Sequence, residues 1–259
     1  MYLTSLEHPQ APLAAWQKGK IVHMSTFILV HGAWHGGWCW GRVAPLLRAQ
    51  GHEVFTPTLT GISDRAHLLS PAVDLSTHVE DIVRLIDAEG LHDVVLVGHS
   101  YAGMVISGVA QARPDALKLR VHLDAFLPTD GEAAIDLLPE GPAHHYREAV
   151  AGPGFGWLIP PRSLEILGVT DQADLDWLTP RLTPHPWATY AEAISLGAEE
   201  KSVAGVYVEC VDWLRVFQPQ AERAQARGWQ VHELPTGHEA MVTLPTELAT
   251  LLDNIATTA

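Results

Sequence analysis

The sequence of 259 residues predicts an α/β fold in which helices flank a mostly parallel sheet. Short β-branched and apolar runs alternate with longer stretches of helical character, and this alternation is typical of βαβ units. The residues with catalytic chemistry follow directly after the apolar runs. Because ligands of such sheets bind at the carboxyl ends of the strands, the sequence also predicts where the site lies.

The elements are expected in a simple order along the chain. A strand over 26–30 leads to a helix over about 37–50, and Gly51 fits its end. A strand at 52–56 precedes a helix from Leu75 to about Glu89, for which Ser76 is a plausible cap and Gly90 the terminator. Further strands are expected at 94–97, 119–123, 203–208 and 229–234. A helix that runs to about Ala112 is expected after the strand at 94–97.

The stretch 126–197 interrupts this alternation. It is rich in proline and contains only short helical pieces, at 175–178 and 187–196, so we interpret it as a cap inserted before the late strands. Aromatic side chains in and beside the cap are expected to form an apolar substrate pocket. The candidates for that pocket are Trp34, Phe126, Tyr146, Trp157 and Trp187.

The pentapeptide Gly98-His99-Ser100-Tyr101-Ala102 follows the apolar run 94–97 directly. A strand that ends in Gly-x-Ser-x-small and opens into a helix is the pattern of a nucleophile elbow, which exposes the serine hydroxyl above the sheet. A serine that merely caps a helix gives a similar local pattern. We therefore looked for the other groups that a nucleophilic Ser100 requires.

Two backbone N–H groups are needed to hold the oxyanion of an acyl-transfer reaction. One is expected from Tyr101, the residue after the nucleophile. The other is expected from the glycine-containing loop His31-Gly32-Ala33 after the first strand, with Ala33 as first choice and Trp34 as second.

A general base and an acid complete the arrangement. His238 lies in a loop after the last strand, and the chain order serine, acid, histidine is the one expected for this type of enzyme. Asp212 is the first choice for the acid that orients His238, with Glu209 and Asp124 as alternatives. All three carboxylates follow the ends of predicted strands, so the sequence leaves this choice open.

Five segments carry a resemblance to a known family. They are residues 31–40, residues 56–61, the elbow, residues 123–128, and Thr236-Gly237-His238. With them the chain from about Thr26 resembles the α/β-hydrolase superfamily, in the branch of plant methylesterases, hydroxynitrile lyases and bacterial carboxylesterases, including pyrethroid-hydrolase-like enzymes. The resemblance implies an α/β-hydrolase fold and a serine hydrolase that cleaves carboxylic esters through an acyl-enzyme.

Departures from the family pattern refine this expectation. Ala102 stands where the family usually has glycine, and Trp213 stands where many bacterial relatives have aspartate. Hydroxynitrile lyases of this branch have threonine and lysine where this chain has Gly32 and Glu239, so lyase chemistry is disfavoured. A lactone or carbon–carbon bond hydrolase, or a receptor-like ligand-binding protein on the same fold, stays open as an alternative.

Composition limits the partners. The net charge of −14 argues against nucleic acid, and no apolar run reaches the length of a membrane span. With only Cys39 and Cys210, the cytoplasm is the expected compartment. We expect residues 1–23 to be a flexible leader and residues 24–259 a single domain. A small-molecule ester is the expected partner, with no cofactor and no metal, and a homodimer stays open.

Overall fold

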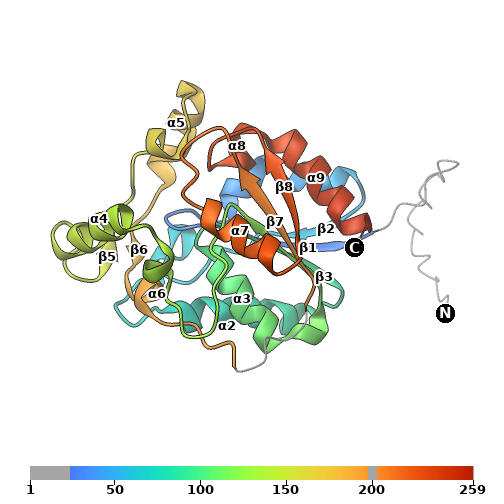
Figure 1. Ribbon diagram of the computed structural model, residues 1–259, viewed down its shortest axis with the longest axis horizontal. Coiled ribbons are helices and arrows are strands. Elements are labelled where there is room, and N and C mark those ends of the chain that lie inside the picture. The colour runs from blue at the N-terminus through green and yellow to red at the C-terminus, as the bar shows by residue number, and fades with distance from the viewer. Residues whose placement is uncertain (1–23, 198–202, 259) are drawn as a thin grey trace, which may run out of the picture.

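The computed structural model describes residues 24–197 and 203–258, so the leader expected over residues 1–23 lies outside the described part of the chain. Its main sheet has six parallel strands in the order β2-β1-β3-β4-β7-β8 (Figure 1). The fold class predicted from the strand–helix alternation is confirmed. The strands are β1 (Thr26–Val30), β2 (Glu53–Phe55), β3 (Val94–His99), β4 (Leu117–Leu123), β7 (Gly205–Cys210) and β8 (Gln230–Leu234).

Helices cover both faces of the sheet, which is why its central strands are apolar on both sides. Alternate residues of β3 point to opposite faces of the sheet and belong to two hydrophobic clusters. Val94 and Leu96 pack with α2 (Leu75–Glu89) and α3 (Ala102–Ala112). Val95 and Val97 belong to the opposite cluster. That cluster includes residues of α1 (Ala44–Ala49), α8 (Ala240–Thr243) and α9 (Pro245–Thr258), while α7 (Gln218–Ala226) packs against β7.

The local capping of α2 differs from the expectation. Its bounds are those predicted, and Gly90 ends it in the left-handed conformation. The N-cap is Asp74, whose carboxylate accepts hydrogen bonds from the N–H and the hydroxyl of Thr77. Ser76 is not the N-cap of α2. Its hydroxyl instead donates a hydrogen bond at 2.5 Å to Glu192, which lies in the segment inserted between β4 and β7.

The segment between β4 and β7 contributes no strand to the main sheet over its described residues. It contains α4 (Glu140–Ala151), α5 (Gln172–Leu178), α6 (Ala188–Ala191) and the antiparallel pair β5 (Leu158–Ile159) and β6 (His185–Pro186). Figure 1 shows α4, β5 and β6 standing to one side of the sheet.

Two hydrogen bonds tie this segment to the loop after β1. The indole N–H of Trp34 donates to the carbonyl of Ile159 at 3.1 Å, and the N–H of Thr183 donates to the carbonyl of Trp34 at 3.0 Å. The cap is thereby held over the carboxyl end of the sheet. None of the helices in the described ranges combines the length and the apolar character that crossing a membrane requires.

Candidate active site

Ser100 occupies a strained turn between β3 and α3. Its φ is 55°, in the left-handed region that non-glycine residues rarely adopt. The turn is held by its neighbours: the Ser100 N–H donates to Leu123 at 3.2 Å, and its carbonyl accepts from Gly103 and Phe126, each at 3.1 Å. Strain that persists because surrounding hydrogen bonds enforce it is typical of functional positions.

Two glycines make this turn sterically feasible. A Cβ at Gly103 would lie 1.9 Å from the carbonyl oxygen of Phe126, and a Cβ at Gly98 would lie 2.8 Å from the carbonyl oxygen of Ala102. Ala102, the departure from the family pattern, is fully buried in the core that packs against α3. The close approach of strand and helix therefore depends on positions 98 and 103, and position 102 accommodates a methyl group.

His238 lies in the loop after β8, and its Nδ1 is 2.6 Å from Oδ2 of Asp124. Asp124 follows β4 directly, with a φ of 42°. Its N–H donates to the carbonyl of Val208 at 2.7 Å, and its Oδ1 accepts the N–H of Cys210 at 3.3 Å. The end of the neighbouring strand β7 thus fixes the carboxylate that orients the histidine.

This geometry corrects the choice of Asp212, which rested on chain order. Asp212 is exposed, and its N–H donates to the carbonyl of Thr236. Glu209 is buried, but both of its carboxylate oxygens accept hydrogen bonds from Arg215, at 2.9 and 2.8 Å. Asp124, the last of the three alternatives, is the residue that contacts His238.

The environment of His238 favours its protonated form. Burial by itself lowers the pKa of the imidazole, but the hydrogen bond and charge of Asp124, together with the charge of Glu239, raise that pKa above its usual value. The Phe217 ring stacks on His238 with centroids 5.2 Å apart, and Nε2 of His99 donates to the His238 carbonyl at 2.9 Å. The bond to Asp124 places the proton of neutral His238 on Nδ1 and leaves Nε2 unprotonated.

The oxyanion candidates lie in the loop after β1 and directly after Ser100. A Cβ at Gly32 would be 3.0 Å from the Cβ of Ser100, so the loop after β1 runs directly past the serine. Within the described residues, the N–H groups of Ala33, Trp34 and Tyr101 donate to no protein acceptor. They are available as donors, and the choice between Ala33 and Trp34 stays a prediction.

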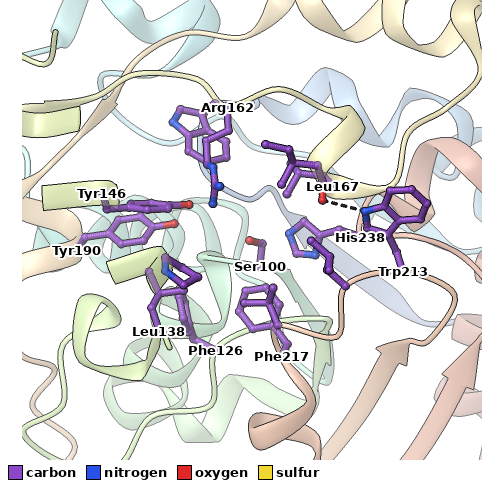
Figure 2. Close-up of a pocket in the computed structure, with 15 residues that line it drawn as sticks. Ser100, Phe126, Leu138, Tyr146, Arg162, Leu167, Tyr190, Trp213, Phe217 and His238 are labelled. Atoms are coloured by element: carbon purple, nitrogen blue, oxygen red, sulfur yellow. Dashed lines mark hydrogen bonds between the residues drawn. The ribbon is translucent and has the colours of Figure 1, made fainter. Parts of the chain in front are cut away.

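Ser100 and His238 share the wall of one cavity, of about 110 Å³, with side chains from the cap (Figure 2). Trp34, Phe126 and Tyr146 line it as expected. Trp157 and Trp187 do not line it: the Trp157 carbonyl accepts the N–H of Trp187, and both belong to the β5–β6 region. Lining residues that the sequence reasoning missed are Leu138, Pro142, Arg162, Ile166, Leu167, Tyr190, Trp213, Leu214, Val216 and Phe217.

The sequence predicts no metal site, and the surroundings of the histidines bear on that prediction. His31 uses both ring nitrogens, one toward the carbonyl of Gly32 and one toward the N–H of Leu59. Over residues 24–197 and 203–258, one group of potential ligands has donor atoms within 4.8 Å of one another, namely His99, His238 and Glu239. The bond from His238 Nδ1 to Asp124 and the bond from His99 Nε2 to a backbone carbonyl already use one nitrogen of each ring.

This chain belongs to the alpha/beta hydrolase family, whose pattern matches residues 27–251. The resemblance drawn from the motifs is thereby confirmed. The chain is 40% identical over 241 residues to a carbendazim hydrolyzing esterase from Nocardioides sp. (strain SG-4G), covering 87% of this chain and 97% of that protein.

Other relatives extend the comparison. Methylesterase 10 from Arabidopsis thaliana is 27% identical over 252 residues, which are 89% of this chain and 91% of that protein. An extracellular alpha/beta-hydrolase from a Paenibacillus species has a similar fold, with a TM-score of 0.79, 24% identity, and coverage of 89% of this chain and 98% of that one.

Proposed function

We propose that this protein is a serine-dependent esterase that cleaves small to medium hydrophobic carboxylic esters. The observation that carries the proposal is the 2.6 Å contact between Asp124 and His238, with His238 and Ser100 in the wall of one cavity. The esterase and methylesterase names of the relatives support the same activity.

In the proposed acylation step each of these groups has one role. His238 Nε2 takes the hydroxyl proton of Ser100 while Oγ forms a bond to the substrate carbonyl carbon. The N–H of Tyr101 and that of Ala33 hold the negative oxygen of the tetrahedral intermediate. The intermediate then expels the alkoxide, which leaves as an alcohol with the proton from His238.

Deacylation repeats these steps with water. His238 takes a proton from the water as its oxygen bonds to the acyl carbon, and the Ser100 oxygen leaves and regains that proton. The products are the carboxylic acid and the free enzyme. Asp124 keeps the Nδ1 proton in place and stabilises the imidazolium in both half-reactions.

Lyase chemistry remains disfavoured for steric and electrostatic reasons. A Cβ at Gly32 would lie 2.9 Å from Nδ1 of His99 and 3.0 Å from the Ser100 Cβ, so threonine has no room at this position. Glu239 is buried, and its carboxylate lies 3.6 Å from the His35 ring. An anionic carboxylate beside the base gives no stabilisation to a departing cyanide ion.

We also propose that the protein acts in the cytoplasm on a small-molecule ester. Cys39 and Cys210 are both buried free thiols, as proteins of a reducing compartment commonly have. The cavity beside Ser100 is small, at about 110 Å³, and its lining is mostly apolar. Short acyl chains are therefore the expected substrates.

The test is hydrolysis of p-nitrophenyl esters, from acetate to octanoate, by the wild type and by Ser100→Ala. We expect turnover by the wild type to decline with chain length and to be lost in Ser100→Ala. Ser195→Ala, at an exposed position, is the matched control and should keep full activity. Wild-type activity that survives in Ser100→Ala contradicts the proposal, as does saturable ester binding without turnover, which favours a receptor.

A further inference from the structure

Arg162 stands out among the residues around the cavity because its positive charge has no matching anion there. None of the lining residues is an aspartate or a glutamate. Arg162 has no ion pair with any residue in the described ranges, and its Nε is buried without a hydrogen-bond partner. A guanidinium that is partly removed from water without a counter-charge costs free energy, so a function is needed to explain its position.

The orientation of Arg162 directs this charge into the cavity. Figure 2 shows its guanidinium extending from the cap toward the middle of the space, on the side facing Ser100. The Arg162 Cζ lies 5.6 Å from the centroid of the Tyr146 ring, which is a cation–π contact. The Tyr146 side chain, which also accepts a hydrogen bond from Arg162, thus holds the guanidinium in place, and no carboxylate among the lining residues neutralises its charge.

Two tyrosine side chains lie beside Arg162, and the Tyr190 hydroxyl donates a hydrogen bond to that of Tyr146. Tyr146 and Tyr190 have ring centroids 5.4 Å apart, and both hydroxyls point toward the cavity in Figure 2. Burial raises the pKa of Tyr146 and holds that of Tyr190 well above its usual range, so both stay protonated. Phe126 and Phe217 form an apolar wall on the side of the cavity away from Arg162 (Figure 2).

We propose that Arg162 is a specificity-determining residue, which binds a carboxylate on the part of the ester substrate that enters the cap. This inference rests on the proposed esterase function and names its substrate class: half-esters of dicarboxylic acids, and other esters that carry a free carboxylate. A carboxylate matches the planar donor pair of a guanidinium, and the neutral wall of phenyl rings holds the hydrocarbon between the two carbonyl groups.

The experiment uses three matched methyl esters. Monomethyl glutarate carries the carboxylate, methyl 5-oxohexanoate replaces it with a neutral ketone, and methyl pentanoate ends in a methyl group. The kcat/KM of each is measured by methanol release for the wild type, Arg162→Gln and Arg162→Lys. Arg181→Gln is the control, because Arg181 is an exposed cap arginine that does not line the cavity.

We expect the wild type to prefer monomethyl glutarate over methyl pentanoate. Arg162→Gln should lower that preference by about 10- to 100-fold, in line with the loss of a charged hydrogen bond. Arg162→Lys should keep part of the preference, because it keeps the charge but loses the planar fork. Arg181→Gln should leave the preference unchanged.

Two results would overturn the assignment. If Arg162→Gln lowers kcat/KM for all three esters by the same factor, Arg162 is structural. If the ketone loses as much as the half-ester, Arg162 binds a neutral acceptor. Inhibition of p-nitrophenyl acetate hydrolysis by monomethyl glutarate gives a second readout, and a Ki unchanged in Arg162→Gln also contradicts the proposal. A wild type that hydrolyses no ester at all refutes the esterase function itself.

Discussion

Buried histidines should make this protein unstable in acid. His31, His78 and His122 are fully buried. Burial lowers the pKa of His31 and of His122 to about 3 and that of His78 to about 4. His99 and His185, also buried, are shifted in the same direction for the same reason.

The hydrogen bonds of these rings show why they stay neutral. His31 donates from Nδ1 to the carbonyl of Gly32 at 2.8 Å, and its Nε2 accepts the N–H of Leu59 at 3.0 Å. His78 accepts from the Tyr101 hydroxyl at Nδ1 and donates from Nε2 to a backbone carbonyl. A second proton on either ring would turn an acceptor into a donor and break the bond to that N–H or hydroxyl.

The size of the effect follows from the pKa difference between the folded and unfolded chain. In the unfolded chain each imidazole has its ordinary pKa of 6.5. Stability is full above pH 6.5 and is lost as the pH falls toward the folded pKa, because the unfolded state binds more protons. At pH 5 the loss is about 2 kcal/mol for each ring and about 6 kcal/mol for His31, His78 and His122 together. A typical domain has only about 5–15 kcal/mol in total.

The assay is urea unfolding, followed by circular dichroism, at steps of half a pH unit from pH 8 to pH 5. The free energy of unfolding should fall by at least about 4 kcal/mol per pH unit near pH 5, because His31, His78 and His122 take up three protons and His99 and His185 add to the uptake. His238 acts in the opposite sense, because its raised pKa adds stability that is present below pH 6.5 and lost as the pH rises through the folded pKa. The His122→Asn variant can still donate a hydrogen bond to the Phe126 carbonyl. It should take up one proton fewer than the wild type on unfolding near pH 5.

His92→Asn is the control, since the His92 side chain is 84% exposed. Comparing each variant with the wild type cancels the contribution of His238. A free energy of unfolding that changes by less than about 1 kcal/mol between pH 8 and pH 5 would refute the reasoning. So would an unchanged proton uptake in His122→Asn.

Three further predictions concern the site. Asp124→Asn should lower kcat by about 10⁴-fold, whereas Asp212→Asn should stay within about twofold of wild type; the reverse order in steady-state assays would restore the choice from chain order. The acidic limb of the wild-type kcat/KM profile should have its midpoint above pH 6.5, because neutral His238 is the active form, and Asp124→Asn should move that midpoint to lower pH. Gly103→Ala should lower the free energy of unfolding in urea by about 3 kcal/mol or more, because the added Cβ meets the Phe126 carbonyl. Gly41→Ala is the control, since a Cβ at Gly41 has open space around it and should cause no such loss. Equal effects of the two substitutions would contradict the close-packing argument.

Much of the fold could be predicted because its signals are local. The run Val94–Val97 and the elbow after it specify a buried strand, a tight turn and a helix within a few residues, and the structure has β3, Ser100 and α3 in that order. Both bounds of α2 were also readable from periodicity and Gly90. The N-cap of α2 could not be predicted in this way, because Asp74 and Ser76 are both residue types that cap helices. The choice depends on Glu192, far along the chain, which binds the Ser76 hydroxyl.

The sequence by itself determined the candidate nucleophile Ser100, the candidate base His238 and the edge of the sheet where they lie. Only the tertiary structure decided which carboxylate meets His238 and which cap residues enclose the cavity. Asp124 and Glu209 both belong to the neighbouring ends of β4 and β7, so strand position cannot separate them. The difference arises from long-range packing: Arg215 binds Glu209, Asp212 stays in solvent, and the backbone of β7 holds Asp124 toward the histidine.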